Sequence, residues 1–412
     1  MELFYIVIFV FVCLHVIVTF FKKEDGIFQA PFVACLMTLF AFLPQLITVY
    51  ASNLYNSNII FDLVFVMISC LLALFFGFKK NYQIRSSETI KDIRVTSAKF
   101  HLVFLVIIGI AGLLIYKGML PGDWVVAGIF QMFGLVAGII SINIIAKRPK
   151  KSWFYVLIFI GAFYPIVDFA LSIKGSRSRL FYVVLLLCYL LSDRFPEYKK
   201  FIKYAFIFFF VTGTILSASI VEYRSSLKGE VNLNEVDFTK NYTSSFLLKE
   251  ISTNGMDLGN AALGIEYCKN NNHYSFGLIF IDRLIFNYIP ARFVGEKLKS
   301  ELMLSPEDAT LEKRYTKGVT TMTGFYEAFN CFSYLGCLLF YVIGAFMKYC
   351  WVRAKVSLLY FLLYFHSIIF LNIAISHGLT YFFSNFVGLN LFIMPFLSLL
   401  FFKKRLIKKV QL

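Results

Sequence analysis

The sequence predicts an all-α polytopic membrane protein with about 11 transmembrane helices and one large external loop between spans 8 and 9. Of its 412 residues, 59% are apolar and only 16% are charged, whereas soluble domains carry about 25% charged residues. Several apolar runs are long enough, at about 20 residues, to cross a bilayer as a helix. These runs are continuous, and a membrane β-barrel would instead show short alternating segments.

Each predicted span follows one apolar run. In chain order the spans cover residues 3–21, 27–50, 59–78, 100–116, 124–145, 153–173, 180–192, 204–221, 329–347, 357–375 and 383–402. The chain therefore divides into residues 1–221 with spans 1–8, the external loop 222–328, and residues 329–412 with spans 9–11. The seventh run is short, and long cationic side chains at its ends can reach the interface by snorkelling.

The basic residues predict the orientation of the spans. Six basic segments fall on every second connection along the chain, which puts all of them on one side of the membrane: "FKKED", "FKKNYQIRSSETIKDIRVTSAK", "AKRPKKS", "SDRFPEYKKFIK", "KYCWVRAK" and "FFKKRLIKK". By the positive-inside rule, these loops are cytoplasmic, the N-terminus is external and the C-terminus is cytoplasmic. The first apolar run has no basic residue before it, so it is predicted to be a span and not a cleaved signal.

The net charge of +16 does not indicate nucleic-acid binding. Residues 222–317 carry 12 Lys or Arg and 13 Asp or Glu, while the rest of the chain carries 28 and 11. The basic excess therefore lies in the short loops between apolar runs, which is the pattern of membrane topology.

One basic cluster, "KGSRSR", does not follow this rule, because the predicted topology places it outside. Two interpretations are open for Lys174, Arg177 and Arg179. They can snorkel to lipid phosphates, or they can form an anion site, for which the planar fork of arginine is well suited. The preceding Gly175 and Ser176 favour the second interpretation, because they allow close backbone approach near a helix start.

The long external loop contains two candidate interfacial helices. "SSFLLKEISTNGMDLGNAALGIEY" places Leu247, Leu248 and Ile251 on one side, and "SFGLIFIDRLIFNYIPARF" is more apolar and carries Arg283. Such helices lie in the headgroup layer or cover a cavity at the membrane surface. The alternative is an ordinary small subdomain of the loop.

Several polar residues fall at the predicted outer edge of the spans. Asp168 lies near the outer end of span 6, and Arg224 lies where span 8 ends. Glu327 and Asn330 stand at the head of span 9, and His377 lies in the last external turn. Ionisable residues at such positions are candidates for a site, although Asp168 could form an ion pair, Glu327 could cap its helix, and His377 could be merely exposed.

Together these residues indicate an amphiphilic ligand. Five arginines can face the outer leaflet: Arg177, Arg179, Arg224, Arg283 and Arg292. Aromatic residues, among them Tyr326, occur close to them in the sequence. Cationic side chains bind phosphates and aromatic rings pack on sugar faces. The matching ligand has a lipid tail, an anionic head and a polar glycan.

Sequence motifs for other chemistries are absent. The chain has no Walker loop, no G-x-G-x-x-G after a strand, no H-E-x-x-H, no G-x-S-x-G and no D-x-D. The cysteines have neither a metal-ligand spacing nor a disulfide framework. We therefore expect no cofactor, no metal and no nucleotide.

The sequence resembles the Wzy-type polysaccharide polymerases, which include O-antigen and capsule repeat-unit polymerases. The resemblance is carried by "KGSRSRLFYVVLL", by the single dominant outer loop, and by "GVTTMTGFYEAFNCFSYLGCLLFYVIGAF". The last stretch is similar to the family's E…N…G re-entry, with Glu327, Asn330 and Gly336 at the matching positions.

The resemblance implies a glycosyltransferase in the bacterial cytoplasmic (inner) membrane. It would transfer a growing glycan from undecaprenyl pyrophosphate to the next lipid-linked repeat unit, and its partners would include a Wzz-type chain-length regulator and a Wzx-type flippase. The catalytic residues would be Arg177, Arg224, Glu327 and His377. The substrate-binding residues would be Arg179, Arg283, Arg292, Asp168, Tyr326 and Asn330.

Two rival functions stay open. An O-antigen ligase has a similar architecture and differs in its acceptor, which is a lipid core. A flippase or transporter of the lipid-linked oligosaccharide belongs to another class of protein. It would favour charged groups deep in the spans and near-symmetric halves, neither of which is evident here.

Overall fold

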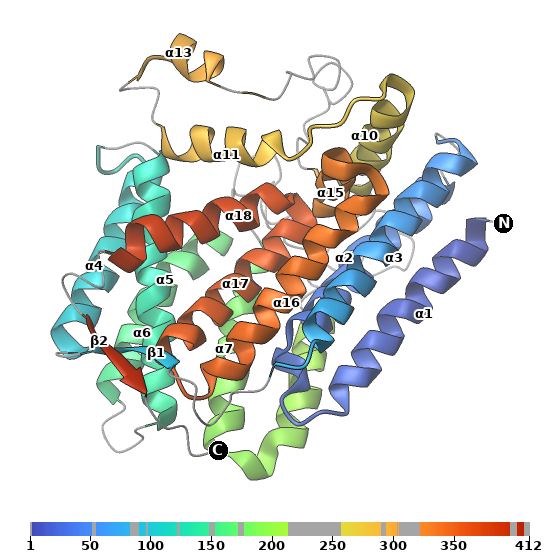
Figure 1. The fold of residues 1–412 in the computed structure, drawn as a ribbon. Helices are drawn as coiled ribbons and strands as arrows, with labels where there is room; N and C mark the ends of the chain where they lie inside the picture. The colour runs from blue at the N-terminus through green and yellow to red at the C-terminus, as the bar shows by residue number, and fades with distance from the viewer. Residues whose placement is uncertain are drawn as a thin grey trace, which may run out of the picture.

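Helices make up most of the described chain in the computed structural model (Figure 1). The structure describes residues 2–51, 55–82, 90–95, 98–121, 124–147, 153–171, 177–212, 257–289, 294–302, 304, 322–395 and 402–407.

The long helices follow the apolar runs. They are α1 (Glu2–Phe21), α2 (Ala30–Ala51), α3 (Ser57–Lys79), α4 (Ala98–Tyr116), α5 (Trp124–Lys147), α6 (Trp153–Leu171), α7 (Arg177–Arg194), α16 (Cys337–Ala354) and α17 (Leu358–His377). Residues 199–212 are also helical. The described part of every predicted span contains a helix.

Within the described ranges, six helices are long and apolar enough to cross a membrane. They cover Leu3–Phe21, Ala30–Ala51, Ser57–Lys79, Val126–Ala146, Gly324–Ala354 and Leu358–His377. Two shorter apolar helices cover His101–Tyr116 and Trp153–Phe163. The protein is therefore helical with candidate membrane spans, and the total of 11 spans stays a prediction.

Helices α3 and α16 pack with their backbones almost in contact. A Cβ atom at Gly77 would lie 2.2 Å from the carbonyl oxygen of Tyr341, and one at Gly344 would lie 2.3 Å from that of Leu74. Small residues at helix crossings permit this close approach in membrane bundles. The two glycines thus fix α3 and α16 as one closely packed pair.

Helix α17 lies inside the bundle, where it packs against α2, α5, α7, α16 and α18 (Leu379–Gly388). Its Tyr364 is fully buried. The Tyr364 hydroxyl accepts a hydrogen bond from the backbone N–H of Ala30 at 3.0 Å and donates one to the carbonyl of Phe28 at 2.7 Å. It thereby satisfies backbone groups at the start of α2, where a helix leaves its first N–H groups without partners.

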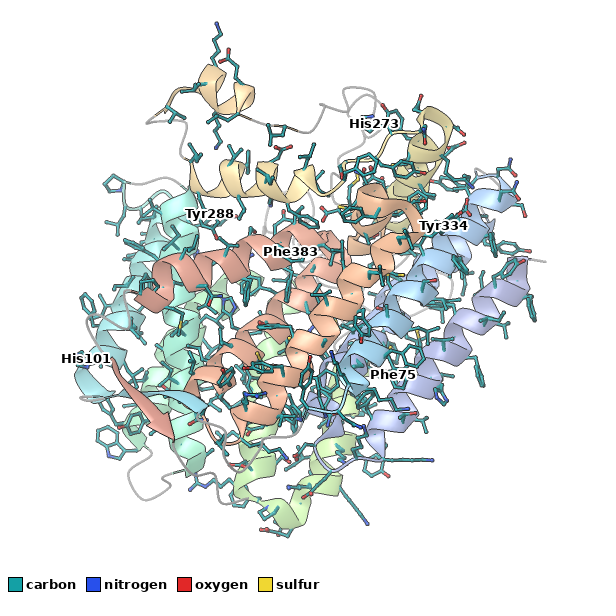
Figure 2. All side chains as sticks on the ribbon, viewed as in Figure 1. Phe75, His101, His273, Tyr288, Tyr334 and Phe383 are labelled. Atoms are coloured by element: carbon teal, nitrogen blue, oxygen red, sulfur yellow. The ribbon has the colours of Figure 1, made fainter. Side chains whose placement is uncertain are left out.

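One end of the bundle is covered by shorter helices: α10 (Asp257–Asn271), α11 (Leu278–Tyr288), α13 (Glu296–Glu301) and α15 (Gly324–Phe332) (Figure 1). We call this the α11 end. The start of α1 lies at the same end. Helix α11 lies across the bundle, and its Tyr288 and the Phe383 of α18 face the space between the two helices (Figure 2). The rings of Phe280 and Phe383 are 4.6 Å apart. The Tyr288 hydroxyl donates to the Ser384 carbonyl at 2.6 Å.

Two short strands accompany the helices, and the predicted helical fold class is confirmed. Strand β1 (Ile90–Val95) pairs antiparallel with β2 (Phe402–Ile407), with Asp92 opposite Arg405. Both strands contain β-branched or apolar residues between charged ones, a composition that favours extended structure. They lie at the end of the bundle opposite α11, which we call the strand end (Figure 1). Both were predicted to be cytoplasmic, and their pairing puts them on one side.

Two predicted spans are interrupted. Residues 329–347 were predicted as one run, but α15 ends at Phe332, the next residue, Ser333, has a φ of +54°, and a 3-10 turn (Ser333–Gly336) precedes α16. The last span, predicted for 383–402, is α18 followed by a π-helical turn (Leu389–Ile393), and its final residue, Phe402, begins β2. Hydrophobicity sets where a chain can enter the membrane and does not report such breaks.

Candidate functional site

The candidate site forms where α15, α17, α18 and α11 meet. Helix α15 begins after Thr323, whose hydroxyl accepts a hydrogen bond from the Tyr326 N–H at 3.2 Å. This cap sets the start of α15. Glu327, in the first turn of the helix, extends from α15 to the start of α18.

The Glu327 carboxylate caps α18. Its Oε2 accepts the backbone N–H of Thr380 at 2.7 Å, and its Oε1 accepts the Thr380 hydroxyl at 3.0 Å. A helix N-terminus has unsatisfied N–H groups and a partial positive charge, both of which favour a carboxylate. The sequence left open that Glu327 caps its own helix. In the structure it lies in α15 but caps α18.

Gly378 makes room for this contact. It links α17 to α18 with a φ of +120°, a conformation nearly restricted to glycine. A Cβ atom there would lie 2.2 Å from Oε1 of Glu327. The turn between the two helices is thus built around the carboxylate.

Arg283 brings a positive charge to the same place from α11. Its guanidinium carbon lies 4.1 Å from the centre of the Tyr381 ring and 5.5 Å from that of Phe286, distances typical of cation–π contacts. Arg283 also interacts electrostatically with Glu327. Its buried Nε atom has no hydrogen-bond partner among the described residues, which is unusual for a buried polar atom.

His377 ends α17 beside this group. Its Nδ1 lies 2.8 Å from the hydroxyl of Ser376, and its ring stands edge-on to Tyr381, with the ring centres 6.3 Å apart. Arg283 and His377 therefore both contact Tyr381. The arrangement combines a cation, an imidazole and a carboxylate, which could bind an anionic leaving group and accept a proton.

Tyr326 and Asn330, predicted to bind substrate, are buried and hydrogen-bonded within the protein. The Asn330 amide nitrogen donates to the Tyr326 hydroxyl at 3.3 Å, and its Oδ1 accepts the Ser275 N–H at 3.2 Å. A Cβ atom on Gly264 would lie 2.2 Å from the Tyr326 ring, which shows how tightly α10 packs there. In this structure both side chains connect α15 to α10 and to the turn before α11.

The other predicted site residues cannot be placed at atomic level. Arg224 and Arg292 lie outside the described residues. Arg177 and Arg179 occupy the first turn of α7, and Asp168 lies in α6, but their side chains are outside the described part. The predicted arginine cluster therefore stays a prediction, apart from the position of Arg283.

One charged group at the α11 end was not predicted from the sequence. Asp62, buried in the first turns of α3, accepts a hydrogen bond from Lys269 of α10 at 2.5 Å and one from the Tyr334 hydroxyl at 2.5 Å. A lone carboxylate in an apolar run is a signal in the sequence itself, because such a residue needs a partner in the membrane. Nothing in the sequence pointed to Lys269 as that partner.

No metal site accompanies these groups: the described residues contain no cluster of three or more His, Cys, Asp or Glu side chains placed to hold an ion. No protein-family model, no curated protein and no solved structure matches the chain. A functional assignment therefore depends on the residues and their geometry.

Proposed function

We propose that the protein polymerises undecaprenyl-pyrophosphate-linked oligosaccharide repeat units into O-antigen or capsular polysaccharide at the outer face of the bacterial cytoplasmic membrane. One observation carries the proposal: Arg283, Glu327 and His377 meet at one end of an apolar helical bundle. The resemblance of the re-entry stretch to Wzy-type polymerases supports the same reaction. In the proposed orientation the α11 end is external.

The proposed reaction has balanced chemistry. A hydroxyl oxygen of the acceptor repeat unit attacks C1 of the donor sugar, and the bond from C1 to the pyrophosphate oxygen breaks. Undecaprenyl pyrophosphate leaves with the electron pair, and the acceptor proton passes to a base. The step needs no nucleotide, because the donor already carries its leaving group.

Each residue has a role that its contacts favour. Arg283 would stabilise the charge that grows on the departing pyrophosphate. Glu327 already accepts two hydrogen bonds from Thr380, so we assign it to holding Arg283 and the start of α18. His377 is then the candidate to accept the proton of the acceptor hydroxyl. The lipid tails would lie along the apolar helices.

Substitution of Arg283 tests the proposal. In a host lacking the wild-type gene, we expect Arg283→Ala to abolish the long glycan ladder and Arg283→Lys to shorten it, because lysine keeps the charge but loses the planar fork. The readout is gel analysis of extracted glycans. Arg194→Ala, at the exposed end of α7, is the matched control and should leave the ladder unchanged.

The same experiment separates the rival functions. A polymerase defect leaves single repeat units displayed outside the cell. A flippase defect abolishes even single units at the surface, and a ligase defect leaves both single units and polymer unattached to the lipid core. A normal ladder with Arg283→Ala would contradict the assignment of this residue.

A further inference from the structure

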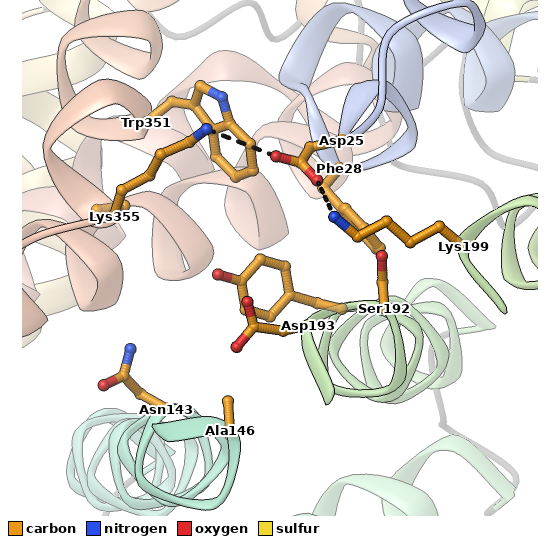
Figure 3. Close-up of a pocket in the computed structure, with 11 residues that line it drawn as sticks. Asp25, Phe28, Asn143, Ala146, Ser192, Asp193, Lys199, Trp351 and Lys355 are labelled. Atoms are coloured by element: carbon orange, nitrogen blue, oxygen red, sulfur yellow. Dashed lines mark ion pairs between the residues drawn. The ribbon is translucent and has the colours of Figure 1, made fainter. Parts of the chain in front are cut away.

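A cavity of about 220 Å³ lies where α5, α7 and α16 end, at the end of the bundle opposite α11 (Figure 1 and Figure 3). Its walls come from the turn between α1 and α2 and from the last turns of α5, α7 and α16. The proposed polymerase reaction uses none of its residues. Its lining includes the polar and charged side chains of Asp25, Asn143, Ser192, Asp193, Lys199 and Lys355, and the aromatic rings of Tyr189 and Trp351.

The lysines of the cavity are already paired with carboxylates. Lys199 contacts Glu24 and lies 3.9 Å from Asp25, and Lys355 lies 3.6 Å from Asp25. Two lysines thus face two carboxylates. Asp193 attracts Lys199 at longer range, but it forms no ion pair within 4.0 Å among the described residues, so its carboxylate oxygens can contact a ligand in the cavity.

Two buried neutral groups also lack partners. Asn143 is only 6% exposed and Ser192 only 5%, yet neither side chain is hydrogen-bonded within the described residues. By contrast, Ser141 on the same helix donates to the Ala137 carbonyl at 2.7 Å. Buried polar groups without partners are costly and usually face water or a ligand. Asn143 and Ser192 both line the cavity, and the Asn143 amide points into it (Figure 3).

The surroundings favour a positive ligand. Three helices, α5, α7 and α16, end beside the cavity, and each C-terminus carries a partial negative charge of about half a unit. Tyr189 and Trp351 supply aromatic walls, which attract cations. The acceptors that remain are the Asp193 carboxylate, the Asn143 carbonyl oxygen and the Ser192 hydroxyl.

We propose that this cavity binds a primary ammonium group. Three acceptors match the three N–H donors of such a group, and the negative charge of Asp193 balances its charge. The cavity lies where the apolar helices end, which is the depth of lipid headgroups in a bilayer. The ammonium can therefore come from an ethanolamine phospholipid or from a free amine.

The experiment uses the full-length protein purified in detergent. Its tryptophan fluorescence, to which Trp351 contributes, is titrated with short-chain phosphatidylethanolamine, phosphatidylcholine and phosphatidylglycerol, and with ethylamine. We expect binding of the ethanolamine lipid and at least tenfold weaker binding of the choline lipid, which has no N–H donor, and of the glycerol lipid, which has no nitrogen.

The ethylamine titration identifies the source of the ammonium. Binding of ethylamine as tight as that of the ethanolamine lipid assigns the site to free amines, and much weaker binding assigns it to the lipid headgroup. Both results support an ammonium site. Equal binding of all three lipids, or no binding of either ammonium compound, would overturn it.

Variants locate the binding in this cavity. Asp193→Asn removes the charge, and Ala146→Leu fills the cavity without removing a polar group. We expect each to weaken binding about tenfold or more, because Asp193→Asn loses a charge-assisted hydrogen bond and Ala146→Leu leaves no room for the ligand. Ser141→Ala and Glu197→Gln, which change similar groups outside the cavity, should bind as the wild type does. Gel filtration confirms folding. Unchanged binding in both cavity variants would refute the assignment.

Discussion

At the scale of single residues, the contact between Glu327 and Thr380 organises the candidate site. Both carboxylate oxygens accept hydrogen bonds from Thr380, one from its backbone and one from its side chain. The carboxylate thus holds the start of α18 and presents a negative charge to Arg283. Substitutions at Thr380 or Gly378 should therefore shift the Glu327 carboxylate, although neither residue is assigned to the chemistry.

Thr380→Val removes the hydroxyl donor at nearly constant volume, whereas Thr380→Ser keeps it. We expect Thr380→Val to lower polymer formation about tenfold, because a hydrogen bond to a charged group contributes roughly 1.5–3 kcal/mol. Thr380→Ser should stay near the wild-type level. Quantified glycan ladders from matched amounts of membrane protein check this. Equal ladders from the two variants would show that the hydroxyl does not position Glu327.

Gly378→Ala places a methyl group against the carboxylate in a backbone conformation that alanine avoids. We expect a destabilisation of roughly 2–3 kcal/mol, seen as a lower thermal midpoint of the purified protein in detergent. Gly118→Ala is the control, because Gly118 also has a positive φ of +74° but has open space around it. The thermal midpoint should fall clearly less for Gly118→Ala than for Gly378→Ala. Similar losses at both positions would mean that strain, and not the contact with Glu327, dominates.

The sequence identified part of this site. Glu327, His377 and Arg283 could be selected because charged or titratable residues at the edges of apolar runs are costly to place in a membrane and usually have a partner or a function. Thr380 and Gly378 could not, because their importance comes from a contact between residues 53 positions apart in the chain. The arginines at the start of α7 stood out equally, but the described residues leave their side chains unplaced.

At the scale of elements, Asp62 holds α10 to the end of the bundle. It binds Lys269 of α10 and Tyr334 of the turn before α16. Two further hydrogen bonds tie the start of α10 to the bundle, one from the Leu258 N–H to Gln45 at 3.1 Å and one from the Tyr55 hydroxyl to the Gly259 carbonyl at 3.3 Å. Helix α10 is thereby joined to α2 and α3 by polar contacts.

Lys269→Glu places two carboxylates together and should loosen α10, while Lys269→Met keeps the packing of the side-chain stem. We expect faster amide hydrogen exchange in α10 for Lys269→Glu, with a smaller change for Lys269→Met. Lys269 is partly exposed, so water moderates the energies involved. Lys200→Met, at an exposed position, serves as the control. Wild-type exchange in Lys269→Glu would exclude a holding role for this ion pair.

Apolar runs predicted where the long helices lie, but not how they are interrupted. The break at Ser333 and the π-helical turn at Leu389–Ile393 fall inside runs that look continuous. The pairing of β1 with β2 joins segments more than 300 residues apart, a distance over which a local pattern carries no information. The pattern of apolar residues indicates which segments are buried, whereas helix breaks and strand pairing depend on tertiary contacts.

At the scale of the whole molecule, the predicted orientation places the α11 end outside and the strand end inside. The structure puts α10, α11 and α13 together at one end and the two strands at the other (Figure 1). Both strands come from basic segments predicted to be cytoplasmic. The arrangement is therefore compatible with one membrane crossed by the bundle between these ends.

Labelling of single cysteines tests the orientation. A cysteine at the exposed Lys297 of α13 should react with an impermeant maleimide on intact cells, and one at the exposed Glu197 should react only after permeabilisation. Cysteines at Ser176 and Ser305, both predicted to be external, should behave like Lys297. Labelling at Glu197 in intact cells would reverse the predicted topology.

The close contact of α3 and α16 bears on where a substrate enters. A side chain larger than hydrogen at Gly77 or Gly344 would collide with the opposite backbone, so the spacing of α3 and α16 depends on these two glycines. Asp62 and Tyr334 join α10 to the α11 end of this pair. Under the proposed function, we therefore expect a lipid-linked glycan to reach the site past α11 and α18, which have no such backbone contact with α3 or α16 among the described residues.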